Sequence, residues 1–145
     1  LAILFLLMAS PCLVAGVSIL FGVVGNVSCP EPFNFHVILW EQDTFGDELI
    51  IDFGKGMSVP AGSGKRPYMV NGYLEEADWL GGREVEPLVT YSHNCGTKFR
   101  CLCKDFGDVS EEKAIKVNVN LLKSPLPECS LCSKAEKKWN EYAGI

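Results

Sequence analysis

The chain has 145 residues, of which 48% are hydrophobic and 21% charged, so it has the length of one globular domain and is too short for two ordinary ones. Its formal net charge is −5, and its basic residues do not gather into a cluster. This balance argues against a nucleic-acid-binding protein, because contacts to phosphate groups need a basic face.

The start of the chain is uncharged as far as Glu31. An apolar run at residues 1–8 is followed by small residues, which is the shape of a secretory signal peptide. We expect residues 1–16 to be this signal peptide, with cleavage after Gly16 or after Ser18, and the sequence to begin inside it because a charged start is missing. The alternative is an uncleaved membrane anchor, since residues 1–25 exceed the roughly 20 that span a bilayer.

After the signal peptide, apolar residues alternate with other residues, which is the period of a half-buried β-strand. In one such segment, Phe33, Phe35, Val37 and Leu39 fall on one face, and that face needs a second layer to cover it. Turn residues separate the segments. The predicted strands are 23–29, 33–40, 48–53, 67–74, 88–94, 99–104 and 115–121. Strands at this spacing without intervening helices predict an all-β fold, an antiparallel β-sandwich of about seven strands over residues 17–129.

Helix is predicted in two places. Residues 108–113 are expected to form one helical turn with Ser110 as its N-cap. The C-terminal tail, residues 130–145, is expected to hold a short helix over 130–142, because Ala135, Trp139 and Tyr142 form an amphipathic stripe. Trp79 and Trp139 are expected to pack against the protein, and the alternative is that they are exposed for recognition.

Five short motifs occur in order along residues 23–129. They are Gly25-x-x-x-Cys29, Phe35-His36-Val37-Ile38-Leu39-Trp40-Glu41-x-Asp43, Asn71-Gly72, Glu86-Pro87 followed by His93-Asn94-Cys95, and Asn120-Leu121 with Pro127 and Cys129. Taken together, they resemble the secreted nematode transthyretin-like family. The resemblance implies a transthyretin-like β-sandwich, a cleaved signal peptide and an extracellular location.

Loss of the signal peptide removes Cys12 and leaves an even number of cysteines, which in an oxidising compartment indicates disulfides. They are Cys29, Cys95, Cys101, Cys103, Cys129 and Cys132. Cys95 ends one predicted strand and the next opens after a short turn, so we expect Cys95 to bond to Cys101 or Cys103. The first and last strands of such a sandwich usually share a sheet, which predicts a bond between Cys29 and Cys129. The remaining cysteine of the Cys101-x-Cys103 pair would then bond to Cys132 and fix the tail.

Other side chains have the chemistry of candidate sites. His93, Cys95, Cys101 and Cys103 offer donors that zinc accepts, but secretory thiols oxidise in preference, so we predict no metal and no other cofactor. Strand alternation places His93 on the inward face, where a hydrogen-bonded, structural imidazole is expected. His36 falls on the outward face and is expected to be solvated or to cover the sheet.

Asn26-Val27-Ser28 is a sequon, so Asn26 is a predicted glycosylation site. No catalytic residue is predicted. A related sandwich enzyme hydrolyses 5-hydroxyisourate with several histidines, an arginine and a C-terminal Tyr-Arg-Gly-Ser, whereas this chain has two histidines and ends in Tyr-Ala-Gly-Ile. We predict a secreted, non-enzymatic extracellular binding protein, with an extracellular protein or lipid surface as its partner and the loops 43–47, 60–65 and 75–83 as contact regions. The alternatives are that hydrolase and a membrane-anchored cell-surface module.

Overall fold

The computed structural model describes residues 16–43, 46–55, 57–60, 62, 64–76 and 84–142. In these residues the chain forms nine strands and one helix: β1 (Val17–Ser28), β2 (Phe33–Glu41), β3 (Glu48–Phe53), β4 (Ser58–Val59), β5 (Lys65–Glu76), β6 (Pro87–His93), β7 (Arg100–Asp105), β8 (Lys113–Lys116), β9 (Val119–Asn120) and α1 (Cys132–Tyr142). The predicted all-β class and the predicted C-terminal helix are therefore confirmed. The predicted signal peptide up to residue 15, Trp79 and parts of the three predicted contact loops lie outside the described residues.

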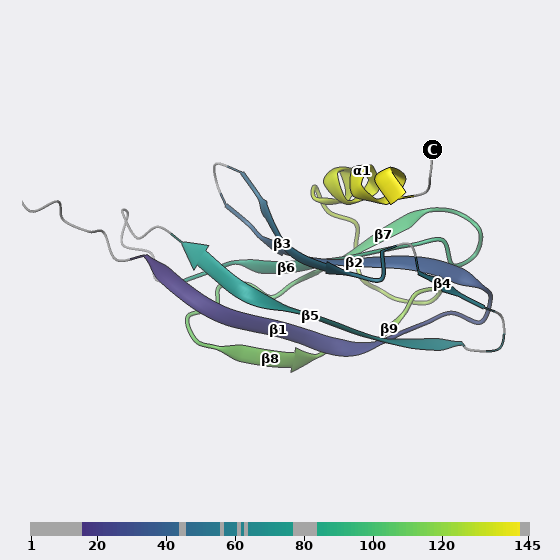
Figure 1. Ribbon diagram of the computed structural model, residues 1–145, viewed down its shortest axis with the longest axis horizontal. Coiled ribbons are helices and arrows are strands. Elements are labelled where there is room, and N and C mark those ends of the chain that lie inside the picture. The colour runs from purple at the N-terminus through teal and green to yellow at the C-terminus, as the bar shows by residue number, and fades with distance from the viewer. Residues whose placement is uncertain are drawn as a thin grey trace, which may run out of the picture.

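The strands form two sheets that lie one above the other (Figure 1). The first sheet has the order β5-β1-β8, and β9 also pairs with β1. The second has the order β3-β2-β6-β7, and β4 pairs with β2. Every pair in the second sheet is antiparallel, whereas β8 and β9 run parallel to β1. The antiparallel sandwich expected from the sequence thus holds except along this one side of β1.

β1 begins at Val17, six residues before the predicted strand, and it fixes the course of the chain between β8 and β9. The Val117 N–H donates to the Val24 carbonyl oxygen at 2.9 Å. A side chain at Gly25 would collide with the Val117 carbonyl oxygen, so only glycine lets the chain approach this closely. The predicted single strand at 115–121 is therefore split into two short ones.

The predicted helical turn at 108–113 is wrong. Val109 instead forms an isolated antiparallel bridge with Val85, in which each N–H donates to the other residue's carbonyl oxygen, at 2.8 and 2.9 Å. Both valine side chains are buried in the core, so burial of Val109 outweighs the local preference of the residues around Ser110 for a helical turn.

Two tyrosines link the sheets through the core. The rings of Tyr68 from β5 and Tyr91 from β6 meet edge to face with centroids 5.5 Å apart, and their hydroxyl oxygens lie 2.7 Å apart. The Tyr68 hydroxyl donates to the Val117 carbonyl oxygen at 2.6 Å, so Tyr91 donates to Tyr68. Burial raises the pKa of Tyr68 to about 12 and raises that of Tyr91 as well, which keeps both hydroxyls protonated and able to donate.

Replacing Tyr68 with phenylalanine should lower the free energy of unfolding by about 1–3 kcal/mol, because the Tyr91 hydroxyl and the Val117 carbonyl would lose their buried partner. Urea unfolding monitored by circular dichroism measures this. The matched control is Tyr73→Phe in the same strand, whose side chain is exposed and which should change the free energy by less than about 0.5 kcal/mol. Equal losses in the two variants would contradict the proposed role of the hydrogen-bond chain.

Candidate functional site

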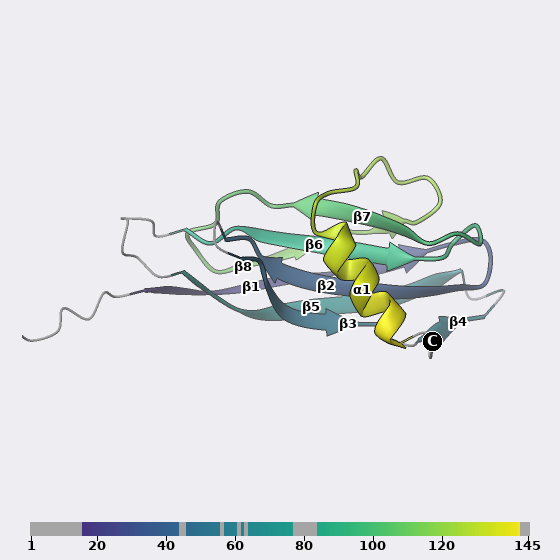
Figure 2. The same ribbon diagram turned by 90° about the horizontal axis from the view of Figure 1, so that it is seen from above.

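The outer face of the second sheet is covered by α1, which lies across its strands in Figure 2. Leu131 and Ala135 are fully buried there against Ile38, Trp40 and Leu88. At the C-terminal end of the helix the Trp139 ring packs on Phe99 with centroids 5.4 Å apart, as its predicted packing role requires. α1 therefore covers the part of this face that carries Ile38, Trp40 and Leu88.

His36 lies on this outer face, as expected, but it is not solvated. Its side chain is only 2% exposed, on the face that carries Ile38 and Trp40. Its Nε2 lies 2.8 Å from Oδ2 of Asp52 on the neighbouring strand β3. His36 is therefore part of a buried layer and does not contact solvent.

Among the described residues, no element covers the outer face of the first sheet, which we call the bare face. Val24 on β1 is 44% exposed, and Met69 and Tyr73 on β5 are 55% and 62% exposed. Strand register joins them, because Val24 lies opposite Met69 and Leu20 lies opposite Tyr73. Figure 1 shows no described element on the side of β1, β5 and β8 that faces away from the second sheet. We call these four side chains, Leu20, Val24, Met69 and Tyr73, the bare-face cluster.

A hollow of about 250 Å³ lies beside this cluster. It is lined by Leu20, Gly22 and Asn71 together with Glu112, Lys113 and Ala114 at the start of β8. Gly22 creates the space, since it has no side chain in the row between Leu20 and Val24. The bare face thus combines apolar side chains with a rim that carries both an acid and a base, a composition typical of protein-recognition surfaces.

Asn26, the predicted glycosylation site, lies on the same strand and the same face as Val24. Its side chain is half-buried, and its backbone N–H donates to Oδ1 of Asn118 at 3.0 Å. Glycosylation of Asn26 stays a prediction, and a glycan there would lie next to the bare-face cluster.

The six cysteines form three disulfides, but two predicted pairings are wrong. Cys29 bonds to Cys95, Cys101 to Cys132, and Cys103 to Cys129. The expected bonds from Cys29 to Cys129 and from Cys95 to Cys101 or Cys103 are absent, whereas a bond from the Cys101-x-Cys103 pair to Cys132 is present.

Side-chain direction explains the two errors. Cys101 and Cys103 lie opposite Ser92 and Thr90 of β6, on the outer face that α1 covers. Cys95 belongs to the inner core cluster at the end of β6, where Cys29 leaves β1. The short turn between β6 and β7 brings the backbones together, yet the sulfurs point to opposite faces of the sheet.

These faces also divide the four residues weighed as zinc ligands. His93 and Cys95 are on the core side, and Cys101 and Cys103 are under α1. The sulfurs of Cys101, Cys103 and Cys132 do lie within 4.8 Å of one another, but each of these cysteines is bonded in a disulfide. A disulfide sulfur has no thiolate to offer a metal.

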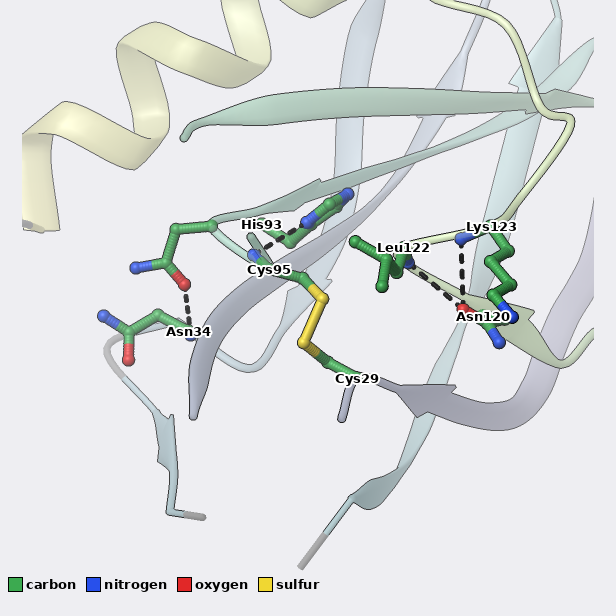
Figure 3. Close-up of a disulfide and its surroundings, with 8 residues drawn as sticks. Cys29, Asn34, His93, Cys95, Asn120, Leu122 and Lys123 are labelled. Atoms are coloured by element: carbon green, nitrogen blue, oxygen red, sulfur yellow. Dashed lines mark hydrogen bonds between the residues drawn. A yellow bond between two sulfur atoms is a disulfide. The ribbon is translucent and has the colours of Figure 1, made fainter. Parts of the chain in front are cut away.

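His93 holds the turn that carries the Cys29–Cys95 disulfide (Figure 3). It is fully buried, as expected, and its Nδ1 accepts the Cys95 N–H at 3.0 Å. Nε2 has no hydrogen-bond partner among the described residues. Burial, with a smaller effect of Arg100, lowers the pKa of His93 to about 4, so the imidazole is neutral at pH 7.

A second hollow, of about 300 Å³, lies on the outside of this disulfide. It is lined by Cys29, Pro30, Leu122 and Lys123, with Ser28, Gly64 and Asn120 completing its wall. Asn120 Oδ1 accepts the N–H groups of Leu122 and Lys123 at 3.2 and 3.1 Å, which fixes the turn after β9 (Figure 3). The space is shallow and its polar groups are used by the turn itself.

Glu41, at the C-terminal end of β2, is a buried acid. Its side chain is 2% exposed, and its two carboxyl oxygens accept the Glu86 N–H at 3.3 and 3.1 Å. Burial raises the pKa of Glu41 against the effect of this hydrogen bond, and with the added effect of the neighbouring Glu76 carboxyl group the pKa reaches about 8. Glu41 is therefore mostly protonated at neutral pH.

The sequence interpretation missed the bare face because it placed the contact regions on loops. The sequence does contain a signal for the bare face. The outward positions of β1 are Leu20, Gly22 and Val24, whereas a strand that faces solvent would carry polar residues there.

No known protein family, no curated protein and no solved structure matches this chain. Among the described residues, no helix has the length and apolar character needed to cross a membrane.

Proposed function

We propose that the protein is a secreted, non-enzymatic binding protein with a transthyretin-like sandwich, and that the bare face of its first sheet binds an extracellular protein. The observation that carries this proposal is the bare-face cluster of Leu20, Val24, Met69 and Tyr73 on a molecule whose opposite face is sealed by a helix. Exposed apolar side chains gathered on one face of a small protein favour an interaction site.

The location rests on the cysteines. Three disulfides join all six cysteines after residue 16, and such bonds form and persist in oxidising compartments outside the cytosol. The transthyretin-like assignment rests on the motif order and on the two stacked sheets.

The non-enzymatic role rests on access. The chain has two histidines, and His36 and His93 are 2% and 0% exposed, so neither reaches a substrate at the surface. The alternative of a transthyretin-related hydrolase needs accessible acid–base groups, and an assay for hydrolysis of 5-hydroxyisourate tests it directly.

A protein partner is favoured over a lipid surface by charge. The chain carries a net charge of −5, whereas attraction to the anionic lipids of a membrane needs a cluster of basic residues. The rim of the hollow, with Glu112 and Lys113, offers instead one charge of each sign for pairing with a protein.

Photocrosslinking tests the proposal. A photoreactive amino acid replaces Tyr73 in the folded, secreted protein, and a matched probe replaces Lys137, which is exposed on α1. In extracellular fluid we expect position 73 to give a discrete adduct with a protein other than a second copy of this chain, and position 137 to give none. Val24→Asp should reduce the adduct at least about tenfold, because a carboxylate would be desolvated at the centre of the interface.

The other outcomes count against the proposal. Crosslinking from position 137 alone would place the binding surface on the helix. Sedimentation with neutral or anionic lipid vesicles, sensitive to Val24→Asp, would replace the protein partner with a lipid surface. Disulfide mapping and circular dichroism of each variant verify that it is folded.

A further inference from the structure

The free edge of the first sheet is formed by β5, a strand of 12 residues. β5 pairs with β1 along its whole length, and on its other side no described strand pairs with it. A long free edge presents unpaired N–H and C=O groups and is a template for another strand. Natural proteins blunt such edges with charges or proline, so the side chains along β5 decide what it accepts.

The backbone groups that face this edge follow from the bonds of β1. The N–H of Asn26 and the C=O of Val24 are directed to the segment 117–118, away from β5. In an antiparallel pair, two residues opposite each other direct their backbone N–H and C=O groups either both toward the partner strand or both away from it. Met69 and Pro67, which lie opposite Val24 and Asn26, therefore direct their backbone groups to the free edge.

By the two-residue period of a strand, Asn71, Tyr73 and Glu75 direct theirs to the free edge as well. The side chains of Met69, Asn71 and Tyr73 are exposed on the bare face. This half of the edge carries no proline and no charge between Met69 and Leu74, so it is left open to pairing.

The charges at the two ends of β5 are opposite. Lys65 and Arg66 begin the strand, and Glu75 and Glu76 end it. A strand with this pattern complements a second copy of itself in the antiparallel direction, because each basic end then meets an acidic end.

We propose that two copies of the chain associate through β5 about a two-fold axis at Asn71, so that the two first sheets become one continuous sheet. In this register Met69 lies opposite Tyr73 of the second copy, and Arg66 lies opposite Glu76 of the second copy. Asn71 lies opposite Asn71 of the second copy, and the two side-chain amides can form a hydrogen bond with each other. Pro67 has no N–H to donate, but it lies opposite Glu75 of the second copy, near the end of the row of hydrogen bonds between the two strands.

A neighbouring register agrees less well with these residues. If the axis passed through Val70, Pro67 would lie opposite Tyr73, and a hydrogen bond would be lost nearer the middle of the strand. Met69 would lie opposite Asn71, which pairs an apolar side chain with an amide. The proposal concerns the edge and a second copy, whereas the proposed function concerns the face and another protein. Dimerisation would place two bare faces side by side.

Sedimentation equilibrium over a concentration series tests the association. We expect the wild-type protein to dimerise and the variants Met69→Glu and Tyr73→Lys each to weaken dimerisation at least about tenfold, through loss of the Met69–Tyr73 contact. An equimolar mixture of the two variants should regain dimers, because the carboxylate introduced in one chain then faces the ammonium group introduced in the other.

The matched control is Val24→Lys, which changes the same face one strand away from the edge. It should leave the dimer intact. A second measurement is amide hydrogen exchange: the amides of Met69, Asn71 and Tyr73 should slow as concentration rises, while the other amides of β5 between them should be slow throughout.

A monomer at concentrations up to about 1 mM would overturn the proposal, since that corresponds to less than roughly 4 kcal/mol of association free energy. So would dimers that are lost in Val24→Lys and kept in Met69→Glu, or a mixture that stays monomeric. Each of these results leaves the crosslinking test of the face unaffected, so failure of the dimer and failure of the proposed function are distinguishable.

Discussion

Replacing Cys29 and Cys95 together with serine should lower the free energy of unfolding by about 4 kcal/mol. The bond closes a loop of 66 residues, and the chain-entropy account of disulfides gives a stabilisation of this size for such a loop. A domain at the low end of the usual range of about 5–15 kcal/mol would then be close to unfolding. Denaturant unfolding of the secreted double variant measures the loss.

The control variant has serine in place of the four cysteines that hold α1. These cysteines form the disulfides Cys101–Cys132 and Cys103–Cys129. Because these bonds fix the helix and not the end of the sandwich, this variant should lose helical signal from α1 while the strands stay paired. A loss below about 1 kcal/mol in the Cys29/Cys95 variant would show that strand pairing alone holds that end of the protein.

The free energy of unfolding should also depend on pH in two opposite ways. The pKa of Glu41 rises from 4.5 to about 8 on folding, so the folded chain holds an extra proton between these values and stability falls as pH rises from 4.5 to 8. The pKa of His93 falls from 6.5 to about 4, so the unfolded chain holds the extra proton and stability falls as pH drops from 6.5 to 4. For these two groups the effects cancel between pH 4.5 and 6.5.

We therefore expect a loss of about 2 kcal/mol between pH 6.5 and 8 that is absent in Glu41→Gln, which keeps the shape of the side chain without its charge. Between pH 4.5 and 6.5, where the two effects cancel in the wild type, His93→Gln should leave the Glu41 effect alone, so the free energy of unfolding should fall as pH rises. Thermal unfolding across this pH range measures both. Parallel curves for the wild type and Glu41→Gln above pH 6.5 would show that Glu41 is already ionised in the folded protein.

Most strands were predictable because their inward residues alternate. Phe33, Phe35, Val37 and Leu39 of β2 are all buried, as their spacing indicates. The first half of β1 was missed because its apolar residues continue the uncharged start of the chain and resemble a leader. Alternation shows that a segment pairs, but it does not show where a helix will later cover the other face.

The candidate site was less predictable than the fold. The cysteine pairing depends on which face each side chain occupies. For Cys101 and Cys103 it also depends on the later segment that brings Cys129 and Cys132 over that face, 26 to 31 residues further along the chain. Exposure of Met69 and Tyr73 likewise depends on the absence of a covering element in the described structure, which no local pattern records. The inward position of His93, by contrast, follows from strand alternation and is confirmed.

The disulfides also determine what a protease can release. A cut between Cys29 and Cys95, which includes most of the exposed loops, leaves two pieces covalently joined, and so does a cut between Cys101 and Cys132. Between Cys29 and Cys132, no disulfide spans the short turn at 96–100, so a cut in this turn would separate the chain into two pieces. A protein nicked anywhere else in this range keeps both of its sheets in one covalent unit, as the proposed extracellular role among proteases would require.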